Sequence, residues 1–435
     1  MKRLSLLLVI LLLAALALVA CQPAGGTDAP VDEAAPTEEA APVDETAATE
    51  VVPADEAADS MECTDAIGCV EIAAGDPIQI ASALVISGPN ADLGLDSQHG
   101  VEIALNMRGD VLGHSVELVA EDDGCSAEGG QTAGTKIVAN PQVIGIIGSS
   151  CSGAGVPMAQ IASDAGFVMI SPSNTAPGLT NPDQSWKPGY LRTAHNDLVQ
   201  GAAMADYAYD VLGVTKAAAI HDGDPYTEGL ASAFSDAFTA KGGEMVAFEA
   251  EAADATNVEP LLTTVAAAGP QFLYYPVFIP LGSLITNTAK NVAGLEEVYL
   301  AAADGVQSPS FLENTVDTSE GMFVSGPDLA FSNTFYQDEF LPAYQEAYGT
   351  APTAPFHAHA YDATMMLLDA VEAVAQQDAD GNLLIGRQAL RDALYATSGY
   401  EGITGTLTCN EFGDCADPKI SVSEVQDGAF VRVWP

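Results

Sequence analysis

The sequence has few basic side chains. Lys and Arg number 13 against 60 Asp and Glu in 435 residues, which gives a formal net charge of −47. Because proteins bind the phosphates of nucleic acids chiefly through Lys and Arg, this excess of acidic residues excludes nucleic-acid binding as a primary role. Histidine is also scarce, with six residues and no paired arrangement suited to a metal cluster or to a nucleophile and its base. The composition therefore indicates neither a metal site nor an enzyme.

Aromatic residues are few as well, at 7%, whereas 40 Gly are present and 48% of the residues are hydrophobic. The length exceeds the roughly 250–300 residues at which a single core usually divides. We therefore expect two domains, and the small residues favour helices packed closely on sheets in an α/β fold.

The N-terminus carries the features of an export signal. Lys2 and Arg3 precede an apolar run at 4–20, which is short for a membrane span and lies where a signal peptide belongs. The run ends in Leu18-Val19-Ala20-Cys21, which resembles a bacterial lipobox. We expect residues 1–20 to be a lipoprotein signal peptide and Cys21 to carry the lipid that anchors the protein to the cell membrane.

After Cys21 the sequence changes to Ala, Pro, Thr, Asp and Glu. Residues 22–60 contain no basic and no aromatic side chain, so they cannot bury enough apolar surface to offset chain entropy. We expect residues 21–75 to be the lipidated Cys and a disordered acidic stalk, followed by the folded body.

Seven cysteines are an odd number, and assigning Cys21 to the lipid leaves six for an oxidising compartment. Six cysteines allow fifteen pairings. Two pairs enclose five residues each, which leaves one long-range pair, and the spacing predicts the disulfides Cys63–Cys69, Cys409–Cys415 and Cys125–Cys151. A metal site is the disfavoured alternative, because the spacing is not that of zinc knuckles.

From residue 76 the chain alternates between short apolar runs and helical stretches. The runs predict strands at 78–86, 115–120, 143–148, 167–170, 217–220, 245–248, 272–277 and 298–301. Repeated βα units of this kind form parallel sheets with helices on both faces. Ligands bind such sheets at the carboxyl ends of the strands.

Three loops follow predicted strands and offer polar groups. Residues 148–153 and 171–175 are rich in hydroxyls that suit a carboxylate, and Asp304 with Gly305 offers a carboxylate that suits an ammonium. One α-amino acid could be held among them. The alternatives are ordinary ones, because Ser-rich turns often cap helices and Asp-Gly is often a turn.

Together these segments resemble the leucine/isoleucine/valine-binding protein family over about residues 76–433. The motifs are SGP at 87–89, DDGC at 122–125, IGSSCS at 147–152, ISPSNT at 170–175, LRT at 191–193, HDGDPYTEG at 221–229 and EGM at 320–322. The resemblance implies the type I periplasmic binding-protein fold: two doubly wound α/β lobes joined by three hinge strands, with the ligand in the cleft. It also implies a disulfide between Cys125 and Cys151, and no cofactor.

The resemblance further implies the bounds of the lobes. We expect lobe I at 77–194 and 327–404 and lobe II at 195–326 and 405–435, with the third hinge strand near 404–407. It assigns ligand contacts as well: Ser152 and Thr175 with the backbone of Ser173 at the ligand carboxylate, Tyr226 and Asp304 from lobe II, and Leu93 and Phe278 near an apolar ligand side chain.

The expected function is that of an extracytoplasmic solute-binding lipoprotein of an ABC importer. It would capture an amino acid, branched-chain or otherwise apolar, and deliver it to permease subunits. We expect the protein to be a monomer that contacts the membrane only through its lipid. The alternatives are a ligand-sensing component for a signalling partner and a binder of amides or urea.

Overall fold

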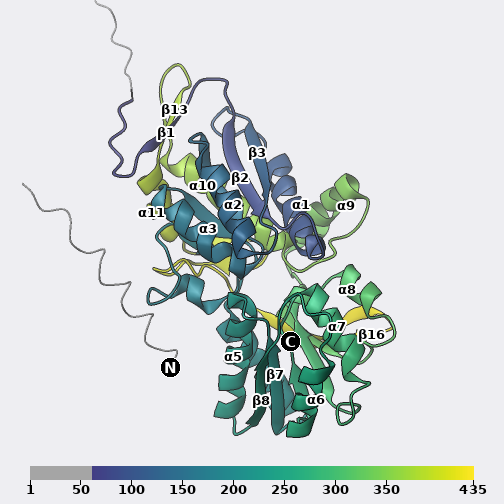
Figure 1. Cartoon of the computed structure of the whole chain (residues 1–435). Coiled ribbons are helices and arrows are strands. Elements are labelled where there is room, and N and C mark those ends of the chain that lie inside the picture. Colours follow the sequence, from purple (N-terminus) through teal and green to yellow (C-terminus); the bar gives the residue numbers. More distant parts are fainter. Residues whose placement is uncertain (1–60) are drawn as a thin grey trace, which may run out of the picture. The chain divides into compact units, whose positions relative to one another are not determined.

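Two β-sheets with helices on both faces organise the chain (Figure 1). The computed structural model describes residues 61–435. The predicted signal peptide, Cys21 and residues 22–60 of the stalk lie outside the described residues. Lobe I is built on a five-stranded sheet, and lobe II on a seven-stranded sheet.

The sheet of lobe I is entirely parallel, in the order β3-β2-β4-β5-β6. Its central strand β4 is apolar and buried at all six positions, as a parallel strand covered on both faces requires. Helices α2 and α3 cover one face, and α1, α10 and α11 cover the other. The bounds are β2 Ile78–Leu84, β3 Val116–Asp122, β4 Val143–Gly148, β5 Val168–Ser171, β6 Tyr190–Arg192, α1 Ala91–Arg108, α2 Ala127–Val138, α3 Ser152–Asp164, α10 His357–Val374 and α11 Arg387–Tyr395.

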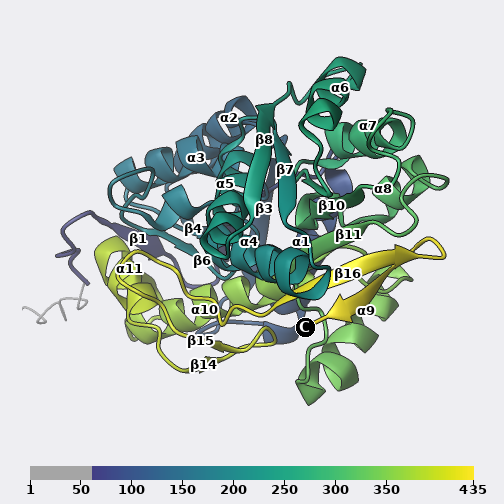
Figure 2. The same cartoon turned by 90° about the horizontal axis from the view of Figure 1, so that it is seen from below.

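The sheet of lobe II has the order β17-β16-β11-β10-β9-β7-β8, and only β16 and β17 run antiparallel to their neighbours. Helices α4 and α5 lie on one face and α6, α7 and α8 on the other, as Figure 2 shows from below. The bounds are β7 Lys216–His221, β8 Glu244–Ala250, β9 Phe272–Tyr274, β10 Tyr299–Ala303, β11 Phe323–Pro327, β16 Ile420–Gln426, β17 Ala429–Trp434, α4 Asp197–Asp206, α5 Pro225–Ala240, α6 Glu259–Ala268, α7 Ile279–Ala289 and α8 Pro309–Asn314.

Smaller elements complete the body. They are β1 Cys69–Ile72, β12 Gln376–Gln377, β13 Leu383–Gly386, β14 Tyr400–Glu401, β15 Thr406–Leu407, α9 Leu341–Tyr348, the 3-10 turns η1 Pro177–Thr180 and η3 Asp304–Val306, and the π-helical turns η2 Tyr207–Val211 and η4 Tyr336–Phe340.

The ordered body begins earlier than the sequence suggested. Strand β1 pairs antiparallel with β13, and the disulfide Cys63–Cys69 closes the loop before it. The Asp65 carboxylate also accepts hydrogen bonds from the first backbone N–H groups of α11, at 2.9 and 3.0 Å. The expectation of a disordered stalk to residue 75 is therefore wrong for residues 63–72, because pairing and capping fix them to lobe I.

Three segments pass between the lobes: residues 193–196 after β6, the end of β11, and residues 416–419 before β16. The expected boundary at 404/405 is wrong. Leu407 and Cys415 are buried in the core of lobe I, and the Asp414 carboxylate pairs with Arg192 of β6. The third crossing therefore lies about ten residues later than the sequence suggested, where the N–H of Asp328 donates to the carbonyl of Lys419 at 2.8 Å.

The six cysteines of the described body form the disulfides Cys63–Cys69, Cys125–Cys151 and Cys409–Cys415, the three pairs that the spacing predicts. Within residues 61–435, no group of three or more His, Cys, Asp or Glu is arranged to hold a metal ion. No helix in that same range has the length and apolarity needed to cross a membrane.

Candidate ligand-binding site

A pocket lies between the lobes at the carboxyl ends of their strands. It encloses about 340 Å³, its opening to solvent included. Six of the seven predicted ligand-binding residues line it, and Thr175 does not. The lining residues are Leu93, Ser150, Cys151, Ser152, Ser173, Tyr226, Phe278, Asp304, Gly305 and Phe356.

The wall from lobe I is made by two loops that hold each other. The Ser173 hydroxyl donates to the carbonyl of Ser150 at 2.9 Å, and the amide of Asn174 donates to the carbonyls of Ser149 and Ser150 at 3.0 and 3.1 Å. Helix α3 begins at Ser152, which lines the pocket, so the positive end of the helix dipole lies at this wall. The hydrogen bonds between the two loops hold this wall rigid.

Arg192 fixes the second of these loops from behind. Its side chain is fully buried and donates to the carbonyls of Asn174 and Ala176 at 3.2 and 2.9 Å. It also pairs with Asp414 beside the third crossing. The sequence singled out Arg192 only as part of a motif, and its role in shaping the loop comes from the fold.

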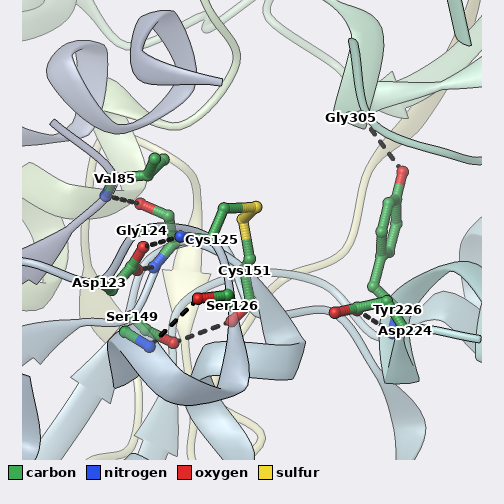
Figure 3. Close-up of a disulfide and its surroundings, with 12 residues drawn as sticks. Val85, Asp123, Gly124, Cys125, Ser126, Ser149, Cys151, Asp224, Tyr226 and Gly305 are labelled. Atoms are coloured by element: carbon green, nitrogen blue, oxygen red, sulfur yellow. Dashed lines mark hydrogen bonds between the residues drawn. A yellow bond between two sulfur atoms is a disulfide. The ribbon is translucent and has the colours of Figure 1, made fainter. Parts of the chain in front are cut away.

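The disulfide Cys125–Cys151 joins the loop after β3 to the start of α3 (Figure 3). Beside it, the buried Asp123 carboxylate accepts hydrogen bonds from the backbone of Cys125 at 2.8 Å and of Ser150 at 2.6 Å. Burial raises the pKa of Asp123 to about 7, although these hydrogen bonds act in the opposite direction. Asp123 and the disulfide therefore hold the same two loops together.

The wall from lobe II carries a carboxylate. Asp304, which follows β10, is 4% exposed, and its Oδ1 accepts hydrogen bonds from Gln200 at 2.7 Å and from the Tyr226 hydroxyl at 3.4 Å. The same hydroxyl accepts from the N–H of Gly305 at 3.2 Å (Figure 3). Burial raises the pKa of Asp304 to about 6, although both side-chain hydrogen bonds lower it. A cation beside the Asp304 carboxylate would offset the free-energy cost of burying its negative charge.

A second carboxylate, which sequence reasoning missed, lies behind the first. Asp197 begins α4, is fully buried, and donates its backbone N–H to the carbonyl of Thr175 at 3.0 Å. Burial and the nearby Asp304 raise the pKa of Asp197 well above its ordinary value. Among the described residues, neither the Asp197 carboxylate oxygens nor Thr175 Oγ1 makes a hydrogen bond of acceptable geometry. Neither residue lines the pocket, and the Thr175 hydroxyl lies close enough to the Asp197 carboxylate to lower its pKa, so these two buried groups face each other behind the pocket wall.

The remaining lining side chains are apolar. Phe278 stacks at a tilt on Tyr226 with ring centroids 5.2 Å apart, and Leu93 packs in the core cluster of lobe II although it belongs to lobe I. Phe356, which the sequence did not single out, comes directly before α10 and stacks on His195 at 6.2 Å. No local signal in the sequence distinguishes Phe356 from a core aromatic residue.

The lobes touch on both sides of the pocket. The N–H of Ser310 in lobe II donates to the Asp92 carboxylate of lobe I at 3.2 Å. On the other side, the Asp224 carboxylate of lobe II lies so close to Gly153 of lobe I that a Cβ at Gly153 would meet Asp224 Oδ2 at 2.0 Å. Asp224 and Tyr226 face the loop of the disulfide across the cleft in Figure 3. The structure therefore has the lobes closed on each other.

Comparison with known proteins identifies the family. The family model described as periplasmic binding protein matches residues 77–428, which is most of the chain. The chain belongs to the periplasmic binding protein family. Members of this family are extracytoplasmic substrate-binding proteins of transporters, so this binding protein is not an enzyme.

Relatives of known function are similar over most of their length. The leucine-, isoleucine-, valine-, threonine- and alanine-binding protein of Pseudomonas aeruginosa is 29% identical over 357 residues, which are 81% of this binding protein and 90% of the relative. A leucine-binding protein from Thermotoga maritima has a TM-score of 0.73 at 27% identity and covers 82% of this chain and 97% of its own. A substrate-binding protein from Desulfitobacterium hafniense, solved in complex with leucine, has a TM-score of 0.66 at 26% identity, with 82% and 100% covered. These neighbours confirm the two-lobed type I fold expected from the sequence.

Proposed function

We propose that the protein captures an α-amino acid with an apolar side chain and delivers it to the permease of an ABC importer. The observation that carries this proposal is the pairing within one pocket of a serine-lined wall at the N-terminus of α3 in lobe I with the buried carboxylate of Asp304 in lobe II. A zwitterion with its carboxylate toward α3 and its ammonium toward Asp304 would match both walls.

Each group of the ligand has a partner in this arrangement. Ser152 and the backbone of Ser173 would hold the ligand carboxylate, with Thr175 behind them, outside the pocket lining. Tyr226 would support Asp304 as it takes the ammonium. Asp197 lies behind Asp304 and outside the pocket lining, so Asp304 alone would take the ammonium. The apolar side chains of Leu93, Phe278 and Phe356 would receive the rest of the ligand.

Because the ligand would touch both lobes, it would stabilise the closed form over an open one. The permease would then recognise the closed pair of lobes. Residues 1–20 would direct export, a lipid on Cys21 would anchor the protein, and the acidic segment after it would act as a tether. The names of the similar proteins, which bind leucine, isoleucine and valine, support a branched-chain ligand.

Calorimetry with a panel of ligands tests the proposal: leucine, isoleucine, valine, alanine, glutamate, acetamide and urea. Leucine, isoleucine or valine should bind most tightly. Asp304→Asn should weaken that binding by at least about 100-fold, because removing one member of a buried ion pair costs roughly 3–5 kcal/mol. The exposed Asp254→Asn is the matched control and should bind as the wild type does.

The panel also separates the alternatives. Tight binding of acetamide or urea, with no response to amino acids, would replace the proposal with that of an amide binder. Unchanged affinity for the best amino acid in Asp304→Asn would remove Asp304 from the ammonium site.

A further inference from the structure

The side-chain amide of Gln200 connects the carboxylate of Asp304, which lines the pocket, to two of the segments that cross between the lobes. Gln200 lies in α4 and is 0% exposed. Its Nε2 donates to Asp304 Oδ1 at 2.7 Å and to the carbonyl and hydroxyl oxygens of Ser325, each at 3.1 Å. Its Oε1 is hydrogen-bonded to Nε2 of His195. Both ends of the amide are therefore used.

The two neighbours fix which way the amide points. A carboxylate can only accept from Nε2, and Oε1 can only accept, so His195 must carry its hydrogen on Nε2. Burial lowers the pKa of His195 to about 4, although the hydrogen bond to Gln200 acts in the opposite direction, so His195 is neutral near pH 7. A flipped amide would place Oε1 against the Asp304 carboxylate and two donors against each other at His195.

The partners of Gln200 lie at mechanically distinct places. His195 is in the first crossing, residues 193–196, and Ser325 is in β11, which leads to the second. Asp304 lines the pocket. Bending at the crossings changes the backbone angles of these segments. The hydrogen bonds of the Gln200 amide therefore depend both on the conformation of the crossings and on the position of Asp304.

The same contacts select one oxygen of Asp304. The hydrogen bonds from Gln200 and Tyr226 both end on Oδ1. Oδ2 is thus the oxygen left to meet a cation in the pocket. Rotation of the carboxylate would bring Oδ1 to the pocket only by breaking both hydrogen bonds.

We propose that Gln200 is a positioning residue that aims Asp304 Oδ2 at the ligand's ammonium and couples this recognition to closure of the lobes. The inference rests on the proposed function, since it concerns how Asp304 meets a charged amino group. Gln200 itself acts through Asp304 and does not touch the ligand.

The test compares Gln200→Leu with the wild type by calorimetry, using leucine as the probe over pH 5 to 8. Loss of a hydrogen bond to a charged group should weaken leucine binding by roughly tenfold to 100-fold at pH 7.5. The hydrogen bond from Gln200 lowers the pKa of Asp304, so its removal should also move the loss of binding on acidification to higher pH. The groups that face Asp304 from neighbouring elements, Asp197, Tyr226 and Tyr274, are unchanged in this variant.

Two further variants control for folding. Gln98→Leu removes another buried glutamine, which bonds Ser82 and Glu102 in lobe I, and it should bind leucine with the wild-type pH midpoint. Gln200→Asn keeps an amide but is one methylene too short to reach Asp304 and His195 together. It should shift the midpoint in the same direction as Gln200→Leu, and it serves where the Leu variant fails to fold.

Three results would overturn the proposal. The first is wild-type leucine affinity in both Gln200 variants, the second is weaker binding with an unchanged pH midpoint, and the third is the same shift in Gln98→Leu. Failure of the proposed function gives results that differ from these three. In that case Asp304→Asn would bind leucine as the wild type does, or the wild type would not bind leucine. In the Asp304→Asn background, Gln200→Leu should cause no further loss.

Discussion

Replacing Gly153 by Ala should prevent full closure of the lobes. An added Cβ would lie 2.0 Å from Asp224 Oδ2, whereas carbon and oxygen normally approach to roughly 3.3 Å, so the two must separate by about 1.3 Å. Asp224 cannot move freely, because its other oxygen caps α5 through the N–H of Tyr226 at 2.9 Å. Loss of that cap costs about 1 kcal/mol, and overpacking costs roughly 1–3 kcal/mol. Leucine should therefore bind roughly fivefold to 150-fold more weakly.

The same substitution should not harm the folded lobes. Ala is a better helix former than Gly by about 1 kcal/mol, so the ligand-free open protein should melt at an unchanged or higher temperature. Calorimetry with leucine gives the affinity, and small-angle scattering with and without leucine gives the extent of closure. The matched control is Gly134→Ala in α2 of the same lobe, where the nearest atom to the added Cβ is Cγ of the flexible Met158 at 3.2 Å. The reasoning is refuted if Gly153→Ala binds and closes as the wild type does, or if Gly153→Ala in an Asp224→Ala background is weaker than Asp224→Ala alone.

Three other outcomes can be measured. Cys21→Ser should move the protein from the membrane fraction to the soluble fraction, and a variant that stays in membranes contradicts the lipid anchor. Reduction of Cys125–Cys151 should weaken leucine binding and lower the melting temperature, since this disulfide joins two loops of lobe I beside the pocket. Mass spectrometry maps the reduced thiols, and equal leucine affinity before and after reduction would contradict this role of the disulfide. The ligand-free protein should melt at a higher temperature at pH 5.5 than at pH 7.5. Burial raises the pKa of Asp123 to about 7 and also raises the pKa of Asp197, Asp224, Asp304 and Asp362. These five carboxyls bind more protons in the folded than in the unfolded state, so their contribution to stability falls as pH rises. Burial lowers the pKa of three histidines, His99, His195 and His359, which act in the opposite sense. A lower melting temperature at pH 5.5 would show that the histidines dominate.

Eight strands of the two sheets were predictable because each is a short apolar run bounded by polar turns, whereas β6, β11, β16 and β17 were not among the predicted runs. The prediction at 143–148 coincides with β4, and the others differ from the observed strands by a few residues at one or both ends. The run at 272–277 is the largest difference, since β9 ends at Tyr274. The N–H of Tyr275 still donates to the carbonyl of Ala301 in β10 at 2.9 Å, and the residues after it are buried outside the ladder, where burial alone gives the same apolar pattern.

The site was only partly predictable. Ser152, Ser173 and Asp304 follow strands in the sequence, and parallel sheets bring such positions to one edge. Phe356, directly before α10, and Gln200, within α4, look in the sequence like ordinary core or surface positions. Asp197 also reads as a common first residue of a helix, so its burial could not be recognised from its neighbours in the chain.

Residues near one another in the chain were enough to predict the βα alternation of both lobes, the pairs of cysteines close enough to join, and the polar loops at the strand ends. The points where the chain crosses between the lobes, and the place of residues 63–72 in the folded body, depend instead on the tertiary structure. The same holds for Gln200 lying against Asp304, 104 residues away, and for Gly153 lying against Asp224. These features depend on contacts between segments that lie far apart in the sequence; those within one lobe form when that lobe packs, and the contact of Gly153 with Asp224 forms only when the lobes close.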